Sequence, residues 1–151
     1  IDISDFSIKL FEHLRPDGVN LNLAVSKTNG YVDMFYQKKL SQILTIKKKI
    51  AENVFQGKIK SKKILSKTLS QILNESKYSE RKIDFLDVDV EGADLDVLES
   101  LDFSKYSPEL ICVEYIGKNK NNSDIFNFLK NKNYENIWSG VFSHIFKRLG
   151  S

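Results

Sequence analysis

Two apolar runs that end in acidic residues, with a short acidic segment between them, constrain the fold of this chain most strongly. Residues 83–90 (IDFLDVDV) and 110–115 (LICVEY) have the length and composition of buried β-strands, and residues 94–101 have helical spacing. Ligands of open α/β sheets bind outside the carboxyl ends of the strands. We therefore expect the acidic side chains that follow these strands to lie near one edge of a sheet: Asp87, Asp89, Glu91 and Glu114.

The rest of the chain alternates between helical and extended patterns. Residues 19–25 and 31–36 alternate apolar and polar side chains, and the Asn-Gly turn at residues 29–30 predicts that the two strands form a hairpin. Residues 37–63 favour a loop or a poorly packed helix. The other predicted elements are a strand end at 1–3, helices at 6–14, 68–74 and 124–131, and two short strands within 136–148. This order is typical of an α/β sheet of mixed direction.

Length and composition indicate one domain over residues 1–151, with a basic loop or insertion at residues 37–63. A hydrophobic fraction of 41% is enough for a core, and no apolar run is long enough to cross a membrane. Cys112 is the single cysteine, so no internal disulfide or cysteine zinc cluster can form. A reducing compartment fits this usage, and we expect a cytoplasmic protein.

The net charge of +3 conceals a division of the chain into basic and acidic parts. Residues 38–82 contain 13 Lys and Arg against 3 Asp and Glu, whereas the remainder is acidic. This segment is either a solvated surface or a binding surface for an acidic partner. Nucleic acid is not expected as that partner, because lysine predominates over arginine and only Phe55 and Tyr78 are available for stacking on bases.

The central segment resembles the signature of FkbM-type methyltransferases. The likeness lies in residues 83–86, 89–94, 97–98 and 101–103. Weaker likenesses follow in the family's order at residues 22–26 with Gly30 and 35–36, 68–69 with 72–73, Pro108 with 111–114, and 142–148. The resemblance therefore covers nearly the whole chain.

The resemblance implies a Rossmann-like class I methyltransferase sheet, mostly parallel, with helices on both faces and a C-terminal antiparallel hairpin. It implies S-adenosylmethionine as cofactor. The implied reaction is methyl transfer to a hydroxyl oxygen of a sugar, a glycan or a small natural product, so that the partner is a small-molecule or glycan acceptor.

The resemblance also assigns roles to particular side chains. Asp2 falls where an acid binds the ribose hydroxyls, and Ala24, Val25 and Ser26 fall near the adenine. Asp89 would lie near the sulfonium or the acceptor hydroxyl, where it and Glu91 are the candidate catalytic groups. Glu114 and His144 are expected on the substrate side. Structural alternatives stay open: Asp2 as a helix cap or part of a frayed terminus, Asp87 as a strand residue covered by a helix, Glu91 as a helix cap, and His144 as a packing residue.

Two departures from the family pattern affect these expectations. The family commonly has lysine at the position of Asp87, and the first strand with its glycine-rich loop is not found. That strand is central in the fold, so its absence predicts a gap in the sheet and an exposed edge that favours homodimers. We interpret the chain as part of a longer protein that supplies the strand.

Two other functions compete with the methyltransferase. A methyltransferase-like fold without its glycine-rich loop would serve as a non-catalytic binding module that uses residues 38–82. A metal-dependent hydrolase based on Asp87, Asp89, Glu91 and Glu114 is the weaker alternative, because histidine ligands are lacking and we expect no metal site.

Overall fold

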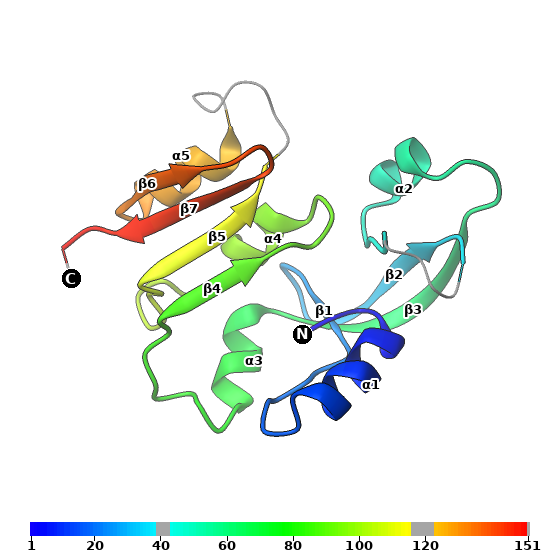
Figure 1. The fold of residues 1–151 in the computed structure, drawn as a ribbon, viewed down its shortest axis with the longest axis horizontal. Coiled ribbons are helices and arrows are strands. Elements are labelled where there is room, and N and C mark those ends of the chain that lie inside the picture. Colours follow the sequence, from blue (N-terminus) through cyan, green and yellow to red (C-terminus); the bar gives the residue numbers. More distant parts are fainter. Residues whose placement is uncertain (39–42, 116–122, 151) are drawn as a thin grey trace.

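A computed structural model of the chain describes residues 1–38, 43–115 and 123–150. Its strands form two separate sheets that lie side by side with the N-terminus between them (Figure 1). The helices are α1 (Asp5–Leu14), α2 (Lys48–Val54), α3 (Leu69–Glu75), α4 (Asp94–Glu99) and α5 (Asp124–Asn131). The strands are β1 (Ala24–Val25), β2 (Gly30–Tyr36), β3 (Lys60–Lys67), β4 (Phe85–Val88), β5 (Leu110–Glu114), β6 (Tyr134–Ser139) and β7 (Ser143–Arg148).

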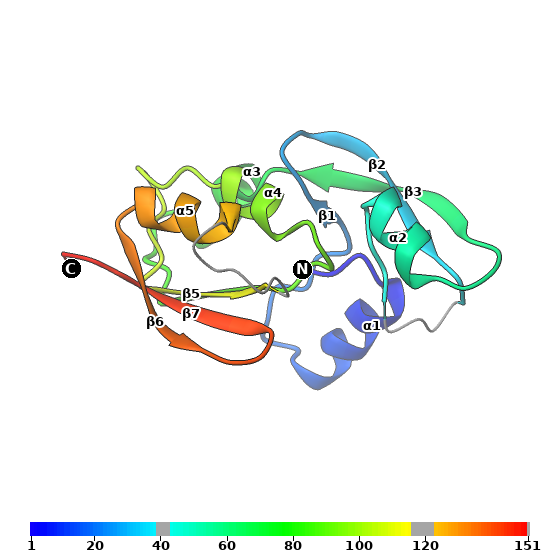
Figure 2. The same cartoon turned by 90° about the horizontal axis from the view of Figure 1, so that it is seen from above.

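The larger sheet has the strand order β4-β5-β7-β6. Strands β4 and β5 are parallel, as expected of two strands joined by a helix, and β7 runs antiparallel to both β5 and β6. Helices α3, α4 and α5 lie over the same face of this sheet (Figure 2). The main core forms under them, where Leu98 of α4 and Leu129 of α5 pack with Ile111, Val113 and other strand residues.

Serine and threonine caps explain where three of the helices begin. The hydroxyl oxygens of Ser4, Thr68 and Ser123 accept hydrogen bonds from the main-chain N–H groups of Ser7, Gln71 and Phe126, which have no partner within their own helices. Helices were predicted at these places, and each is confirmed to within two residues at either end.

The smaller sheet has the strand order β1-β3-β2, which overturns the predicted hairpin. β2 pairs antiparallel with β3, from Gly30 opposite Ser66 to Tyr36 opposite Lys60, and β1 pairs parallel with the end of β3. The hairpin prediction was wrong because a lysine-rich strand lies between its two proposed partners. Residues 37–63 contain α2 and the first residues of β3, in addition to residues outside the described ranges.

The observed fold is therefore mixed α/β, and two features of the expected Rossmann-like sheet are corrected. The sheet is not mostly parallel, since three of the strand pairings are antiparallel. The helices that cover the larger sheet lie on one face of it, not on both (Figure 2). The opposite face leaves Phe85 half exposed, at 52%. The C-terminal antiparallel hairpin, β6 with β7, is confirmed.

Candidate active site

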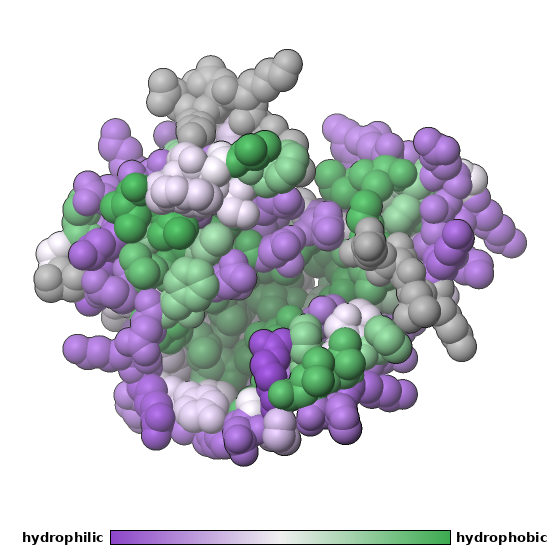
Figure 3. All heavy atoms as spheres, in the orientation of Figure 1, coloured by the Kyte–Doolittle hydropathy of each residue, from purple (hydrophilic) through white to green (hydrophobic). Residues whose placement is uncertain are grey.

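A cleft of about 370 Å³ separates the two sheets. One wall is formed by residues 1–4 and 23–25, and the other by residues 86–91, which are the end of β4 and the turn after it. Aliphatic side chains such as Val25, Ile46 and Val88 line much of the cleft, and Figure 3 shows a hollow with a largely hydrophobic floor between the two halves of the molecule. The volume falls in the usual range for small-molecule sites, roughly 300–1,000 Å³.

The wall formed by β4 is the edge of a sheet. Among the described residues β4 pairs with β5 alone, and the main-chain N–H of Leu110 donates to the main-chain carbonyl oxygen of Asp84 at 3.0 Å. Because main-chain groups alternate in direction along a strand, those of Phe85 and Asp87 point away from β5 and toward the cleft side. The polypeptide backbone along this wall is therefore open to a hydrogen-bonding partner.

Acidic side chains gather where β4 and β5 end. Burial raises the pKa of Glu91, and the nearby charges of Asp89 and Glu114 raise it further. Burial and the charge of Asp89 likewise raise the pKa of Glu114. Among the described residues, no lysine or arginine forms an ion pair with any of these carboxylates. The site therefore has a negative charge that a cationic ligand would offset.

Asp94 adds a buried carboxyl at the start of α4. It is only 4% exposed, and within the described part of the chain its Oδ1 has no hydrogen-bond partner. Its Oδ2 accepts a hydrogen bond from the N–H of Gly92 at 3.2 Å. Burial, with a further contribution from Glu114, raises the pKa of Asp94 to about 6.

A tight turn places these groups. After β4 the chain passes through Glu91 with φ 51° and Gly92 with φ 86°, both in the left-handed region. Glycine adopts this conformation readily, whereas glutamate adopts it at some cost in energy. The turn directs the chain from the end of β4 into α4, and α4 begins at Asp94 without a side-chain cap. Glu91 is therefore not the helix cap that was one alternative for it.

A comparison with protein families assigns the chain. The model of the Methyltransferase FkbM domain family matches residues 9–135 of the 151 residues. The chain belongs to the FkbM methyltransferase family. Comparisons with curated proteins and with solved structures found no match. Asp2 and His144 lie outside the matched residues.

Most of the residues predicted to bind the cofactor of this FkbM methyltransferase line the cleft. Asp2, Ala24 and Val25 line the cleft on the wall opposite β4, and Asp89 and Glu91 line it on the β4 side. Ser26 does not line it: its hydroxyl is 2.6 Å from that of Ser66 and donates to Thr28 O at 2.9 Å. The side chain of Ser26 therefore stabilises the turn before β2.

The two residues predicted on the substrate side lie in different surroundings. Glu114 is half-buried at the end of β5 and belongs to the acidic group described above. His144 is 2% exposed and packs edge-on against Phe126, with ring centroids 5.2 Å apart. One of its ring nitrogens, Nε2, lies 3.3 Å from the carbonyl oxygen of Tyr115. These contacts place His144 under α5, as a packing residue.

Sequence reasoning did not identify two residues of this site. Asp94 was not distinguished from Asp96, the other acid in the first turn of α4, which forms an ion pair with Lys47. Thr45 lies in the segment for which no pattern was found, yet it is fully buried and contacts Glu91. A burial prediction for α4 is the one signal that separates Asp94 from Asp96, because the two differ by two positions and so face different directions.

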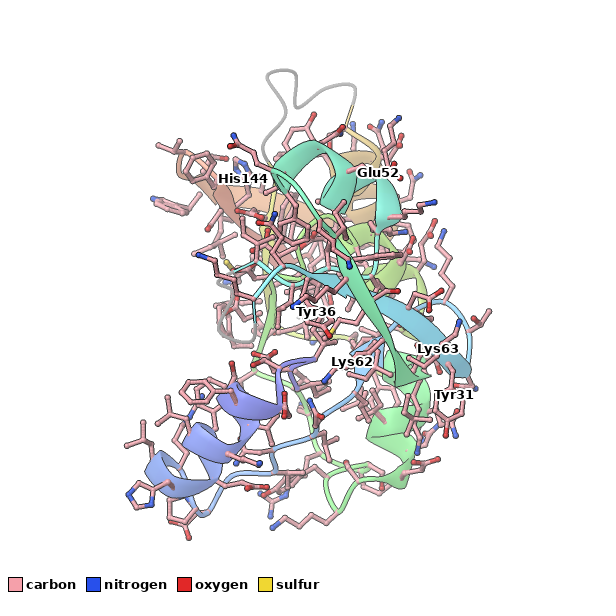
Figure 4. The ribbon with its side chains drawn as sticks, turned by 90° about the vertical axis from the view of Figure 1, so that its right-hand side faces the viewer. Tyr31, Tyr36, Glu52, Lys62, Lys63 and His144 are labelled. Carbon is pink, nitrogen blue, oxygen red and sulfur yellow. The ribbon has the colours of Figure 1, made fainter. Side chains whose placement is uncertain are left out.

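The lysine-rich segment provides several ion pairs with acids from elsewhere in the chain. Lys63 pairs with Asp33 at 3.0 Å and Lys62 with Asp5 at 3.8 Å. Figure 4 shows both lysines along β3, away from His144 in the other sheet. Within the ranges described, no helix is long and apolar enough to cross a bilayer, and no group of three or more His, Cys, Asp or Glu is placed to hold a metal ion.

Proposed function

We propose that this chain is an S-adenosylmethionine-dependent O-methyltransferase that acts on a hydroxyl of a sugar, a glycan or a small natural product. Membership of the FkbM methyltransferase family supports the transferase activity. The observation that carries the proposal is the composition of the cleft, which has aliphatic walls, Asp2 on one side and unneutralised carboxylates on the other.

The residues of the cleft match the parts of the cofactor. Aliphatic side chains such as Val25 and Ile46 suit the flat face of a purine. Asp2 Oδ1 accepts a hydrogen bond from Ser4 N at 2.7 Å, which holds the carboxylate in place, and its second oxygen, Oδ2, would accept from a ribose hydroxyl. The negative charge at Asp89 and Glu91 suits a sulfonium cation. The cofactor, when bound, supplies an electrophilic methyl group.

The acidic group would act on the acceptor in two ways. Asp89 is exposed at the end of β4 and is the candidate that orients the acceptor hydroxyl by accepting its hydrogen bond. Glu91 and Glu114 have raised pKa values, so each holds a proton more readily than an ordinary glutamate and can receive the proton that the hydroxyl loses. Positioning of the hydroxyl accounts for most of the rate in such a reaction.

We also propose that residues 1–151 form one methyltransferase-like domain, and that a strand paired with the open edge of β4 completes its cofactor site. Support comes from the main-chain groups of Phe85 and Asp87, which face away from β5. The alternative of a non-catalytic binding module on residues 38–82 has less support, because Lys47, Lys62 and Lys63 are engaged with acids of this same chain.

Calorimetric titration with S-adenosylhomocysteine tests the proposal. Saturable binding is expected, and Asp2→Ala should weaken it about tenfold by removing a charge-assisted hydrogen bond. Asp17→Ala, in the exposed turn after α1, is the matched control and should bind normally. If this chain does not bind, the same titration on an N-terminally extended protein follows. Absence of binding there too would contradict the proposal.

A further inference from the structure

Thr45 is buried at the junction of the two sheets. It is 0% exposed and lies between β2 and α2. The N–H of Phe35 in β2 donates to the carbonyl oxygen of Thr45 at 2.8 Å, and the N–H of Thr45 donates to the carbonyl oxygen of Phe35 at 3.4 Å. This pairing attaches Thr45 to the smaller sheet. Its neighbours Leu44 and Ile46 line the cleft.

The hydroxyl of Thr45 connects this sheet to the acidic turn after β4. Thr45 Oγ1 donates to the carbonyl oxygen of Glu91 at 3.0 Å, across a sequence separation of 46 residues. The same oxygen accepts a hydrogen bond from the N–H of Lys47 at 3.0 Å. A hydroxyl has one hydrogen to donate, so the bond from Lys47 leaves that hydrogen directed at Glu91.

Glu91 needs this support more than an ordinary residue does. Its φ of 51° is unfavourable for any residue other than glycine. Asp89 and Glu114 also repel its carboxylate when all three are charged. Without a fixed main chain, Glu91 would relax toward extended backbone and its carboxylate would move toward solvent, away from the other two acids.

A second contact from the same segment supports the next residue. The side chain of Ile50 in α2 packs directly against Gly92, on the side where any other residue would carry a Cβ. Residues 45–50 therefore supply one hydrogen bond and one packing contact to the turn of Glu91 and Gly92, in addition to the hydrogen bond from the Gly92 N–H to Asp94 Oδ2.

We propose that Thr45 is a positioning residue whose hydroxyl holds the Glu91 main chain in place and so keeps the Glu91 carboxylate beside Asp89 and Glu114. The inference rests on the proposed function for the importance of Glu91 in methyl transfer. The effect of Thr45 on Glu91 is a property of the chain alone and can be measured without cofactor.

The test compares two substitutions that differ in the hydroxyl. Thr45→Val removes it and keeps the shape of the side chain, whereas Thr45→Ser keeps it. Thr28→Val makes the same change at an exposed threonine and serves as the control. The first measurement is the pKa of the Glu91 carboxyl by NMR titration, with the Gly92 amide shift. The second is the affinity for S-adenosylhomocysteine by calorimetry.

In Thr45→Val we expect the pKa of Glu91 to move toward its ordinary value, the Gly92 amide to shift, and the affinity to fall about tenfold. Thr45→Ser and Thr28→Val should resemble the unaltered protein. A folded Thr45→Val protein with unchanged Glu91 and Gly92 signals would overturn the inference. If Thr45→Val does not fold, the unaltered protein should still show a slowly exchanging Thr45 hydroxyl proton close to Glu91, and its absence would count equally against it.

The two proposals fail in different ways. If the unaltered protein binds no S-adenosylhomocysteine in either length but Glu91 responds to Thr45→Val, the methyltransferase function fails and the role of Thr45 stands. If the protein binds the ligand but the pKa of Glu91 is unchanged in Thr45→Val, the proposed role of Thr45 fails and the proposed function stands.

Discussion

Ile50 and Gly92 are packed so closely that a Cβ added to Gly92 would lie 3.0 Å from Ile50 Cγ1. The contact joins α2 to the turn after β4, and Gly92 also has φ 86°, where other residues are strained. Space and backbone conformation thus both require glycine at this position.

Replacing Gly92 with alanine should destabilise the protein for both reasons. We expect Gly92→Ala to lower the free energy of unfolding by about 2–3 kcal/mol, from the positive φ and from the contact with Ile50. Gly57→Ala is the matched control, because Gly57 has φ 92° but open space where its Cβ would lie. It should lose only about 1 kcal/mol. Urea denaturation measures both, and equal losses would show that the Ile50 contact is unimportant.

The buried carboxyl of Asp94 should make stability depend on pH. Its pKa is raised from 3.8 to about 6 in the folded state, so the folded protein binds this proton more tightly than the unfolded chain does. The stability of the protein should therefore fall as the pH rises between those two values. Asp94→Asn is neutral at every pH. It should be more stable than the unaltered protein above pH 6, by roughly 2–3 kcal/mol.

Asp102 should contribute a pH dependence of stability of the opposite sign, which Asp102→Asn removes. Hydrogen bonds from Ser104 lower the pKa of Asp102, so its contribution to stability is present above its unfolded pKa and is lost on acidification. Thermal unfolding of the three proteins between pH 2.5 and 7.5 distinguishes the cases, because the contribution of Asp102 changes only below its unfolded pKa of 3.8. An Asp94→Asn curve parallel to that of the unaltered protein would mean that Asp94 is not buried as a proton-binding group.

The charge at Asp89 should distinguish the cationic cofactor from its neutral product. We expect Asp89→Asn to weaken binding of S-adenosylmethionine several-fold more than binding of S-adenosylhomocysteine, because only the former carries a sulfonium. Asp84→Asn, at the other end of β4, should leave the ratio of the two dissociation constants unchanged. Calorimetry with both ligands gives that ratio, and an equal effect on both would place Asp89 away from the sulfonium.

Cys112 should react slowly with alkylating agents. Burial raises the pKa of its thiol to about 11 from 9.0, and the nearby Asp87 adds to the shift. At pH 8 the thiolate fraction is then about a hundredfold lower than in the unfolded chain. Mass spectrometry after iodoacetamide treatment, with and without urea, measures the difference. Asp87→Asn should speed the reaction of the folded protein, and no acceleration would show that burial alone controls the thiol.

The central unit was predictable because its signals are local. The predicted segments 83–90, 94–101 and 110–115 contain β4, α4 and β5, each from a pattern confined to its own segment. The pairing of β2 was not predictable in this way. In β3 only Ile64 and Ser66 are buried, and four of its eight residues are lysines. The segment therefore lacks the alternation of apolar and polar residues by which a strand is predicted. Contacts between segments far apart in the sequence, and not the Asn-Gly turn before β2, determine that β2 pairs with β3.

The cleft itself was predictable only in outline. The sequence placed Asp89, Glu91 and Glu114 at one edge, because strand ends and alternation are local properties. It did not reveal that Asp94 would be buried while Asp96 is only half-buried and forms ion pairs with Lys27 and Lys47. It also did not reveal Thr45, whose neighbours along the chain say nothing about Glu91. Both depend on how separate elements pack.

The open edge of β4 has a consequence for the behaviour of the protein at high concentration. An unpaired strand edge is a template on which another chain can assemble, and edges of this kind start fibres and domain swaps. Asp84, Asp87 and Asp89 place carboxylates along it, so two copies that met there at neutral pH would bring like charges together. Salt screens that repulsion. The solubility of this chain should therefore fall as the ionic strength is raised, while its secondary structure is retained.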